Sequence, residues 1–164
     1  MERIKISLLS DSHDNIKNLQ KSVQIANKEK CTHIFHLGDI VSPMTAGVLK
    51  GFKGDLTGIF GNCDGDKLQL HKVFNKLGGR IENPPLKIVL NKKLFILMHE
   101  PWLIEEVIKS GEADFIFYGH THEDYFRREG KTVIINPGEV SGIKNDPTFY
   151  ILDINKEHFE KIEL

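Results

Sequence analysis

The chain contains 164 residues, of which 40% are apolar, and its formal net charge is −1 at pH 7. This length predicts a single domain spanning residues 1–164, and the near-zero charge argues against strong nucleic-acid binding while permitting a small phosphorylated substrate. No apolar run is long enough to cross a bilayer, the first residues lack a signal-peptide core, and the two cysteines form no disulfide pattern. We therefore expect a cytoplasmic protein without membrane contact.

The first half of the chain alternates strands with helices. The expected elements are strands at 4–9, 32–37 and 56–60 and helices at 15–30, 43–49 and 66–77. The first helix places Ile16, Leu19, Val23 and Ala26 on one face. Repeated strand–helix units predict parallel strands joined by right-handed crossovers.

The second half changes character. Strands at 86–90 and 94–98 flank a predicted hairpin turn at Asn91-Lys92-Lys93. A short helix at 102–109 and a strand at 115–118 follow, and further strands are expected at 124–128, 132–135, 148–154 and 159–163, with residues 136–139 as a loop. No internal repeat or linker divides the chain.

Asp11 and His13 directly follow the first apolar strand. On extended chain, residues two apart project to the same side, so both side chains can face one object. A carboxylate oxygen and an imidazole nitrogen together suit a divalent transition metal. The pair alone is equally compatible with a turn and a helix N-cap.

Other chemically suggestive side chains repeat this placement after strands. With the first pair, the set is Asp11, His13, Asp39, Asn62, His99, His120 and His122. Ligands of parallel α/β sheets gather at the carboxyl ends of strands, so these residues are expected to converge. Gly38, Gly61 and Gly119 precede three of them, where the chain must turn tightly and leave room for a bound group. The competing interpretation is a set of unrelated caps and core residues.

The number of ligands indicates two ions rather than one. Two carboxylates, four imidazoles and one amide oxygen exceed the needs of a tetrahedral ion. They suit two ions roughly 3.5–4 Å apart, with positions left for water and substrate, an arrangement that clamps phosphorus during in-line displacement. Asp39 is the natural bridge, because a carboxylate can offer oxygens to two cations.

This ordered set resembles the calcineurin-like metallophosphoesterase family. The matching blocks are Asp11-Ser12-His13, Gly38-Asp39, Gly61-Asn62-Cys63-Asp64, His99 and Gly119-His120-Thr121-His122. The chain looks most similar to the small single-domain archaeal and bacterial phosphodiesterases, in which residues 136–139 also have a counterpart. The resemblance implies an α/β (α+β) fold of two mixed β-sheets packed as a sandwich and flanked by helices, which gives four layers.

The resemblance also implies roles for the seven residues. One metal would be held by Asp11, His13, Asp39 and His122, and the second by Asp39, Asn62, His99 and His120. A hydroxide bridging the two divalent ions would be the nucleophile, with Asp39, Asn62 and His99 as the catalytic residues. Mn²⁺ is the expected metal, with Ni²⁺, Fe, Zn²⁺ and Mg²⁺ as alternatives.

The sequence departs from the family pattern at two places. Many members have a histidine where this chain has Cys63, and a thiol is the poorer proton donor to a leaving alkoxide. We therefore expect a preference for acidic leaving groups or strained cyclic phosphodiesters, unless Cys63 is merely a small packed residue. Relatives often carry Gly-His after the histidine at 99, whereas this chain has Glu100-Pro101.

Several other residues receive structural interpretations. Asp14 and Asp64 are expected to cap helices or to orient metal-bound histidines, and His36 to lie either in the core or under the site. Trp102 is expected in the core rather than at a substrate platform.

The expected function is hydrolysis of a small phosphodiester. The alternatives are a non-catalytic scaffold of the same fold, like the retromer subunit, and a phosphomonoesterase or nuclease. Exposed strand edges make a homodimer plausible.

Overall fold

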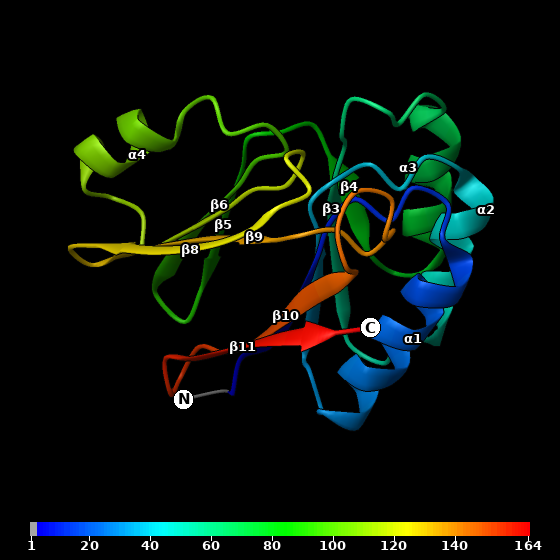
Figure 1. Ribbon diagram of the computed structural model, residues 1–164, viewed down its shortest axis with the longest axis horizontal. Helices are drawn as coiled ribbons and strands as arrows, with labels where there is room; N and C mark the ends of the chain where they lie inside the picture. Colours follow the sequence, from blue (N-terminus) through cyan, green and yellow to red (C-terminus); the bar gives the residue numbers. More distant parts are fainter. Residues whose placement is uncertain (1–2) are drawn as a thin grey trace.

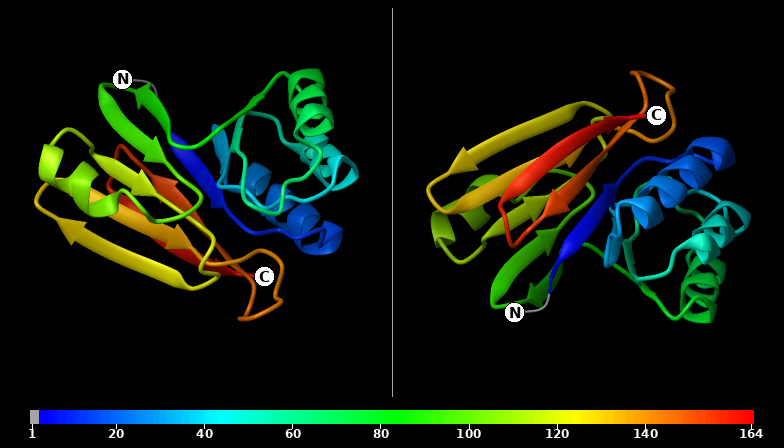
Figure 2. Two further views of the ribbon diagram at one scale, coloured as in Figure 1. Left: turned by 90° about the horizontal axis from the view of Figure 1, so that it is seen from above. Right: turned by 90° about the horizontal axis from the view of Figure 1, so that it is seen from below.

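The computed structural model describes residues 3–164, which form two mixed sheets (Figures 1 and 2). In spatial order, the six-stranded sheet contains β11 (His158–Glu163), β10 (Thr148–Asp153), β1 (Lys5–Leu9), β2 (His33–His36), β3 (Asp55–Ile59) and β4 (Arg80–Glu82). The five-stranded sheet contains β5 (Leu86–Leu90), β6 (Lys93–Leu97), β7 (Phe115–Phe117), β9 (Thr132–Pro137) and β8 (Asp124–Glu129).

Each sheet has a parallel centre. Strands β1, β2 and β3 pair in parallel, as the strand–helix alternation predicted, and β4 adds a further parallel strand beside β3. Strands β6, β7 and β9 are the parallel centre of the second sheet. The strands β10, β11, β5 and β8 are antiparallel additions. Five parallel strands, β1, β2, β3, β6 and β7, therefore precede the loops that carry the site.

Helices cover the outer face of each sheet. Helices α1 (Ile16–Lys28), α2 (Pro43–Ala46) and α3 (Lys67–Lys76) lie against the first sheet, and α4 (Ile104–Ser110) lies over the second (Figure 1). The side chains of Asn15, Ser42 and Asp66 accept hydrogen bonds from backbone N–H groups in the first turns of α1, α2 and α3.

Alternating side chains divide the interior into three cores. Leu8 of β1 packs between the sheets with Phe117 of β7, whereas Leu9 faces the helices of the first layer. Ile116, on the other face of β7, packs toward α4. The three cores lie between four successive layers, in the order helices, first sheet, second sheet and helix. The predicted sandwich flanked by helices is confirmed.

Some local expectations were wrong. Strand β4 was not predicted, because its three residues, of which only Ile81 is buried, are too few to form a recognisable pattern. The second part of the helix expected at 43–49 is a 3₁₀ helix, Gly47–Gly51, and Asn136 and Pro137 belong to β9 rather than to a loop. Within residues 3–164, no helix is long and apolar enough to span a membrane.

Candidate metal centre

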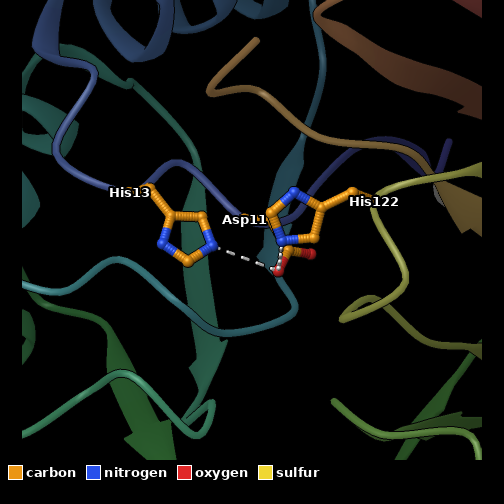
Figure 3. Close-up of side chains that lie close together, drawn as sticks. All are labelled: Asp11, His13 and His122. Carbon is orange, nitrogen blue, oxygen red and sulfur yellow. Dashed lines mark ion pairs between the residues drawn. The ribbon is translucent and has the colours of Figure 1, made fainter. Parts of the chain in front are cut away.

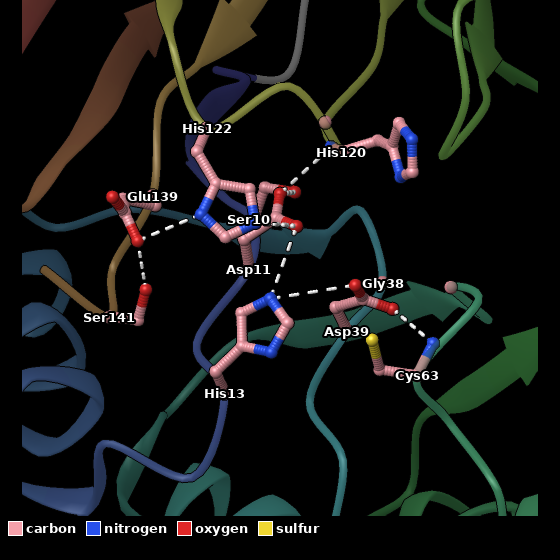
Figure 4. A network of polar contacts seen from close by, with 12 residues as sticks. Ser10, Asp11, His13, Gly38, Asp39, Cys63, His120, His122, Glu139 and Ser141 are labelled. Atoms are coloured by element: carbon pink, nitrogen blue, oxygen red, sulfur yellow. Dashed lines mark hydrogen bonds and ion pairs between the residues drawn. The ribbon is translucent and has the colours of Figure 1, made fainter. Parts of the chain in front are cut away.

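The seven polar side chains predicted to converge do meet. Figure 4 labels Asp11, His13, Asp39, His120 and His122 among them. They come from the loops after β1, β2, β3, β6 and β7. Hydrogen bonds and short nitrogen–oxygen contacts link all seven into a single network. The interpretation of unrelated caps and core residues is therefore excluded.

One half of the network is formed by Asp11, His13 and His122 (Figure 3). Asp11 Oδ1 lies 3.6 Å from His13 Nε2 and 3.4 Å from His122 Nε2. The other oxygen, Asp11 Oδ2, accepts hydrogen bonds from Ser10 Oγ and from the backbone N–H of His120. One carboxylate oxygen is thus fixed by the protein, and the other faces two imidazole nitrogens.

Asp39 joins this half to the rest. Its Oδ2 lies 3.5 Å from His13 Nε2 and 3.4 Å from His99 Nε2. Its Oδ1 accepts a hydrogen bond of 2.8 Å from the backbone N–H of Cys63. Asp39 therefore lies between two groups of nitrogen donors, as a bridging carboxylate must.

Asn62 completes the other half. Its Oδ1 lies 2.9 Å from His99 Nε2 and 2.9 Å from His120 Nδ1. An amide oxygen and two ring nitrogens therefore converge beside Asp39. This combination of oxygen and nitrogen donors suits divalent transition metals.

Two histidines are oriented by acceptors behind the site. His99 Nδ1 donates to the carbonyl oxygen of Leu37 over 2.7 Å, and His122 Nδ1 lies 2.9 Å from Glu139 Oε2. A ring that donates through Nδ1 can present the lone pair of Nε2 to a metal, so these contacts select the ligating tautomer.

Glu139 is a residue whose role sequence reasoning missed. It is fully buried and accepts hydrogen bonds from Ser141 Oγ and from the backbone N–H groups of Ile143, Lys144 and Asn145. Burial raises the pKa of Glu139, but these hydrogen bonds outweigh burial and hold it at about 2. The sequence feature that could have indicated this role is a charged residue directly after Pro137-Gly138 in an otherwise apolar stretch.

The backbone around the site is unusual. Five of the seven residues have positive φ: Asp11 at 51°, His13 at 38°, Asp39 at 56°, His120 at 68° and His122 at 67°. Asp11 and His13 therefore converge through a left-handed turn, and the expected extended geometry was wrong. Non-glycine residues adopt such angles at a cost of about 1–3 kcal/mol each, and they cluster at functional sites.

The glycines that directly precede Asp39, Asn62 and His120 leave room for atoms of neighbouring loops. A Cβ on Gly61 would lie 2.1 Å from Asp39 Oδ1, and one on Gly119 would lie 2.0 Å from Ser10 Oγ. A Cβ on Gly38 would lie 2.6 Å from the backbone nitrogen of Gly61. The expectation of room for a bound group was wrong, because each glycine lets one loop approach another.

Three further polar residues support the loops. Asp64 accepts hydrogen bonds from the backbone N–H groups of Asp39, Val41 and Gly61, so it shapes the loops and neither caps a helix nor orients a histidine. Asp14 accepts from Ser42 N–H and Thr45 Oγ1, whereas Asn15 caps α1.

His36 lies under the site, where its Nε2 is 3.1 Å from Ser12 Oγ. Burial lowers the pKa of His36 to about 4, so its ring is neutral at pH 7. Both expectations for His36 therefore hold, since it is a core residue and it also supports the Asp11–His13 turn.

The electrostatics of the network fit bound cations. Asp11 Oδ1 and His13 Nε2 are buried and have no hydrogen-bond partner among residues 3–164. Burial raises the pKa of Asp39, but contacts with His99 and the N–H of Cys63 outweigh it and hold the pKa below its usual range. Burial lowers the pKa of His99, but the neighbouring Asp39 outweighs it and raises the pKa. The ionised carboxylates therefore favour positive charge at the histidine nitrogens, and a bound metal ion would provide that charge.

Cys63 is exposed at the mouth of the site. The interpretation as a packed residue was therefore wrong. Its Sγ accepts a hydrogen bond of 3.3 Å from Asn62 Nδ2 and lies near ligand atoms of His13 and Asp39.

Comparison with known proteins identifies the family. Residues 4–157 match the model of the calcineurin-like phosphoesterase superfamily domain. The chain is 31% identical to a protein of Methanocaldococcus jannaschii named a phosphodiesterase, over 98% of this chain and 99% of that protein. A solved structure described as a novel archaeal phosphodiesterase superposes with a TM-score of 0.93 at 31% identity, covering 98% of this chain and 100% of that one.

More distant structures share the fold alone. Vps29 of Entamoeba histolytica, solved with zinc, has a TM-score of 0.73 at 16% identity, covering 98% of this chain and 99% of that one. The E. coli phosphoesterase YfcE has a TM-score of 0.68 at 18% identity, covering 97% and 98% of the two chains. The extent of the family match and the archaeal relative lead to one conclusion: this chain belongs to the calcineurin-like phosphoesterase superfamily.

Proposed function

We propose that this protein is a phosphodiesterase that uses two divalent metal ions, with Mn²⁺ as the working metal. The observation that carries the proposal is the position of Asp39 between His13 on one side and His99 on the other. The M. jannaschii relative named a phosphodiesterase supports the reaction class. The near-zero net charge favours a small phosphodiester over nucleic acid as substrate.

The residues divide into two ligand sets. Asp11, His13, Asp39 and His122 would hold the first ion, and Asp39, Asn62, His99 and His120 the second. When bound, the two ions would supply a hydroxide nucleophile at neutral pH and would neutralise charge on the phosphoryl oxygens. Asn62 also carries N–H groups that can donate to a substrate oxygen.

The function is tested with chelator-treated protein. We expect Mn²⁺ to restore hydrolysis of methyl para-nitrophenyl phosphate, with Ni²⁺, Fe²⁺, Zn²⁺ and Mg²⁺ assayed in parallel. Faster turnover of para-nitrophenyl phosphate would instead indicate a phosphomonoesterase. No turnover of either ester with any ion would favour the scaffold alternative.

Glu139 provides a prediction about metal affinity. Glu139→Gln removes the negative charge behind His122 and is expected to weaken Mn²⁺ binding by about 10- to 100-fold. Isothermal titration of the chelator-treated protein measures this change. Glu160→Gln, at an exposed position on β11, is the matched control. Equal affinities of the two variants would contradict a role for Glu139 in holding His122.

Cys63 provides a prediction about the leaving group. Although Cys63 is exposed, partial desolvation by the surrounding loops and then the neighbouring Asp39 raise its pKa to about 11. A neutral thiol therefore stands where many relatives have histidine. We expect the wild type to hydrolyse methyl phosphodiesters of acidic phenols far faster than dialkyl esters. Cys63→His is expected to raise the alkyl rate by about 10- to 100-fold, because imidazolium is the better general acid. Equal wild-type rates on both classes would refute this prediction.

A further inference from the structure

A separate pocket opens beside the metal centre. Its volume is about 260 Å³, and Asn62 and His99 line the end nearest the site. The apolar part of the lining is formed by Phe60, Pro84, Pro85, Met98, Trp102 and Leu103. A phosphate ester held at Asn62 and His99 would therefore have one of its ester groups next to this pocket.

Two large apolar side chains that line this pocket are exposed to solvent. Trp102 was expected in the core, but it is 78% exposed, and the neighbouring Leu103 is 45% exposed. Phe60 and Met98 are buried. A large aromatic side chain left in water at the edge of a polar site indicates a surface that an apolar group covers.

The charges around the pocket disfavour a highly charged occupant. Besides His99, its charged or titratable residues are Lys67 and Glu100, which have opposite formal charges. Lys67 Nζ lies 5.2 Å from the centre of the Phe60 ring. The pocket therefore offers no concentrated positive charge to a second phosphate, and its favourable interactions are with apolar surface.

We propose that this pocket binds an aromatic group esterified to the substrate phosphate, so that the substrate class is phosphodiesters bearing an aryl group of one or two rings. The inference rests on the proposed function. An engineered cavity of about 150 Å³ binds benzene, and pockets for drug-sized ligands begin at about 300 Å³. The present volume lies between these values. An aromatic group is favoured because two aromatic side chains, Phe60 and Trp102, belong to the lining.

Phosphonates test the pocket without requiring turnover. Phenylphosphonate and methylphosphonate share the head group that binds metal and differ only in the group offered to the pocket. With Mn²⁺ present, we expect phenylphosphonate to bind about tenfold more tightly than methylphosphonate. Cyclohexylphosphonate, which is similar in size but not flat, is expected to bind more weakly than phenylphosphonate.

Trp102 is the only tryptophan in the sequence, so its emission reports directly on the pocket. Phenylphosphonate is expected to shift the emission to shorter wavelength, and methylphosphonate to leave it unchanged. A blue shift that grows with protein concentration alone would show that a second copy covers the pocket, and would overturn the proposal.

Variants separate the pocket from the metal centre. Trp102→Ala removes the fluorophore, so its phosphonate affinities are measured by inhibition of hydrolysis. The affinities of Leu103→Ala are measured by Trp102 fluorescence. In both variants the ratio of phenylphosphonate to methylphosphonate affinity is expected to fall to about threefold or less. Methylphosphonate affinity should not change. Val89→Ala, which truncates an exposed apolar side chain on β5 away from the pocket, is the control and should preserve the preference.

The outcomes distinguish this proposal from the proposed function. Equal affinity for the three phosphonates, or an unchanged preference in both pocket variants, would overturn the aryl site while leaving the phosphodiesterase intact. Failure of every phosphonate to bind in the presence of Mn²⁺, together with absence of diester hydrolysis, would overturn both.

Discussion

Asp39→Asn is expected to lower phosphodiester hydrolysis by about a thousandfold or more at saturating Mn²⁺. Asp39 Oδ2 lies 3.5 Å from His13 Nε2 and 3.4 Å from His99 Nε2, so it is the group that the two proposed ligand sets would share. An amide of the same shape can still accept the N–H of Cys63, so the loop should persist. With its oxygen on the Cys63 N–H, the Asn side chain would turn an NH₂ group toward His13 and His99 in place of the charged oxygen that a cation requires.

The assay compares turnover and thermal stability in the same preparations. Asp55→Ala removes an exposed carboxylate at the opposite end of β3 from the site, and should leave turnover unchanged. If Asp39→Asn retained more than about a tenth of the wild-type rate with two ions still bound, Asp39 could not be the essential bridge.

Gly119→Ala is expected to impair the metal centre by displacing one of the loops that carry its side chains. The added Cβ would lie 2.0 Å from Ser10 Oγ and 2.7 Å from Asp11 Oδ2. Because Ser10 and Asp11 are fully buried, the strain must move the loop that carries His120 and His122. We expect loss of tight Mn²⁺ binding, a large loss of activity, and destabilisation of about 1–3 kcal/mol. For a chain of this size, that corresponds to a melting temperature lower by roughly 2–12 °C.

Gly47→Ala is the matched control, since a Cβ at that position would meet nothing within 4 Å. It should leave both melting temperature and metal affinity close to wild type. A Gly119→Ala protein with normal metal affinity would show that the loops after β1 and β7 do not depend on their close approach.

The sequence was sufficient to predict which side chains meet, because the rule involved is topological. Asp39 and His120 are distant in sequence, but each follows a strand with a parallel neighbour. The carboxyl ends of such strands share one edge, so their loops converge whatever the details of the turns. The two-sheet sandwich was predicted by the family resemblance and not by this pattern.

Details that depend on contacts between loops could not be read from the pattern. The left-handed turn at Asp11 is stabilised by hydrogen bonds to another loop, including one from its N–H to the carbonyl of Gly38. Glu139 becomes important only because the loop after β9 places it against His122. The prediction for Trp102 was wrong because aromatic residues are usually buried, and only the structure shows which of them stay at the surface.

The most direct measurement is an anomalous-scattering map from crystals soaked in Mn²⁺. Two ions per chain are expected, about 3.5–4 Å apart, one on each side of the Asp39 carboxylate. The first should contact Asp11 and His122, and the second Asn62 and His99. A map with no ion at Asp39, or with a single ion that leaves either pair of side chains without contact, would contradict the two-metal centre.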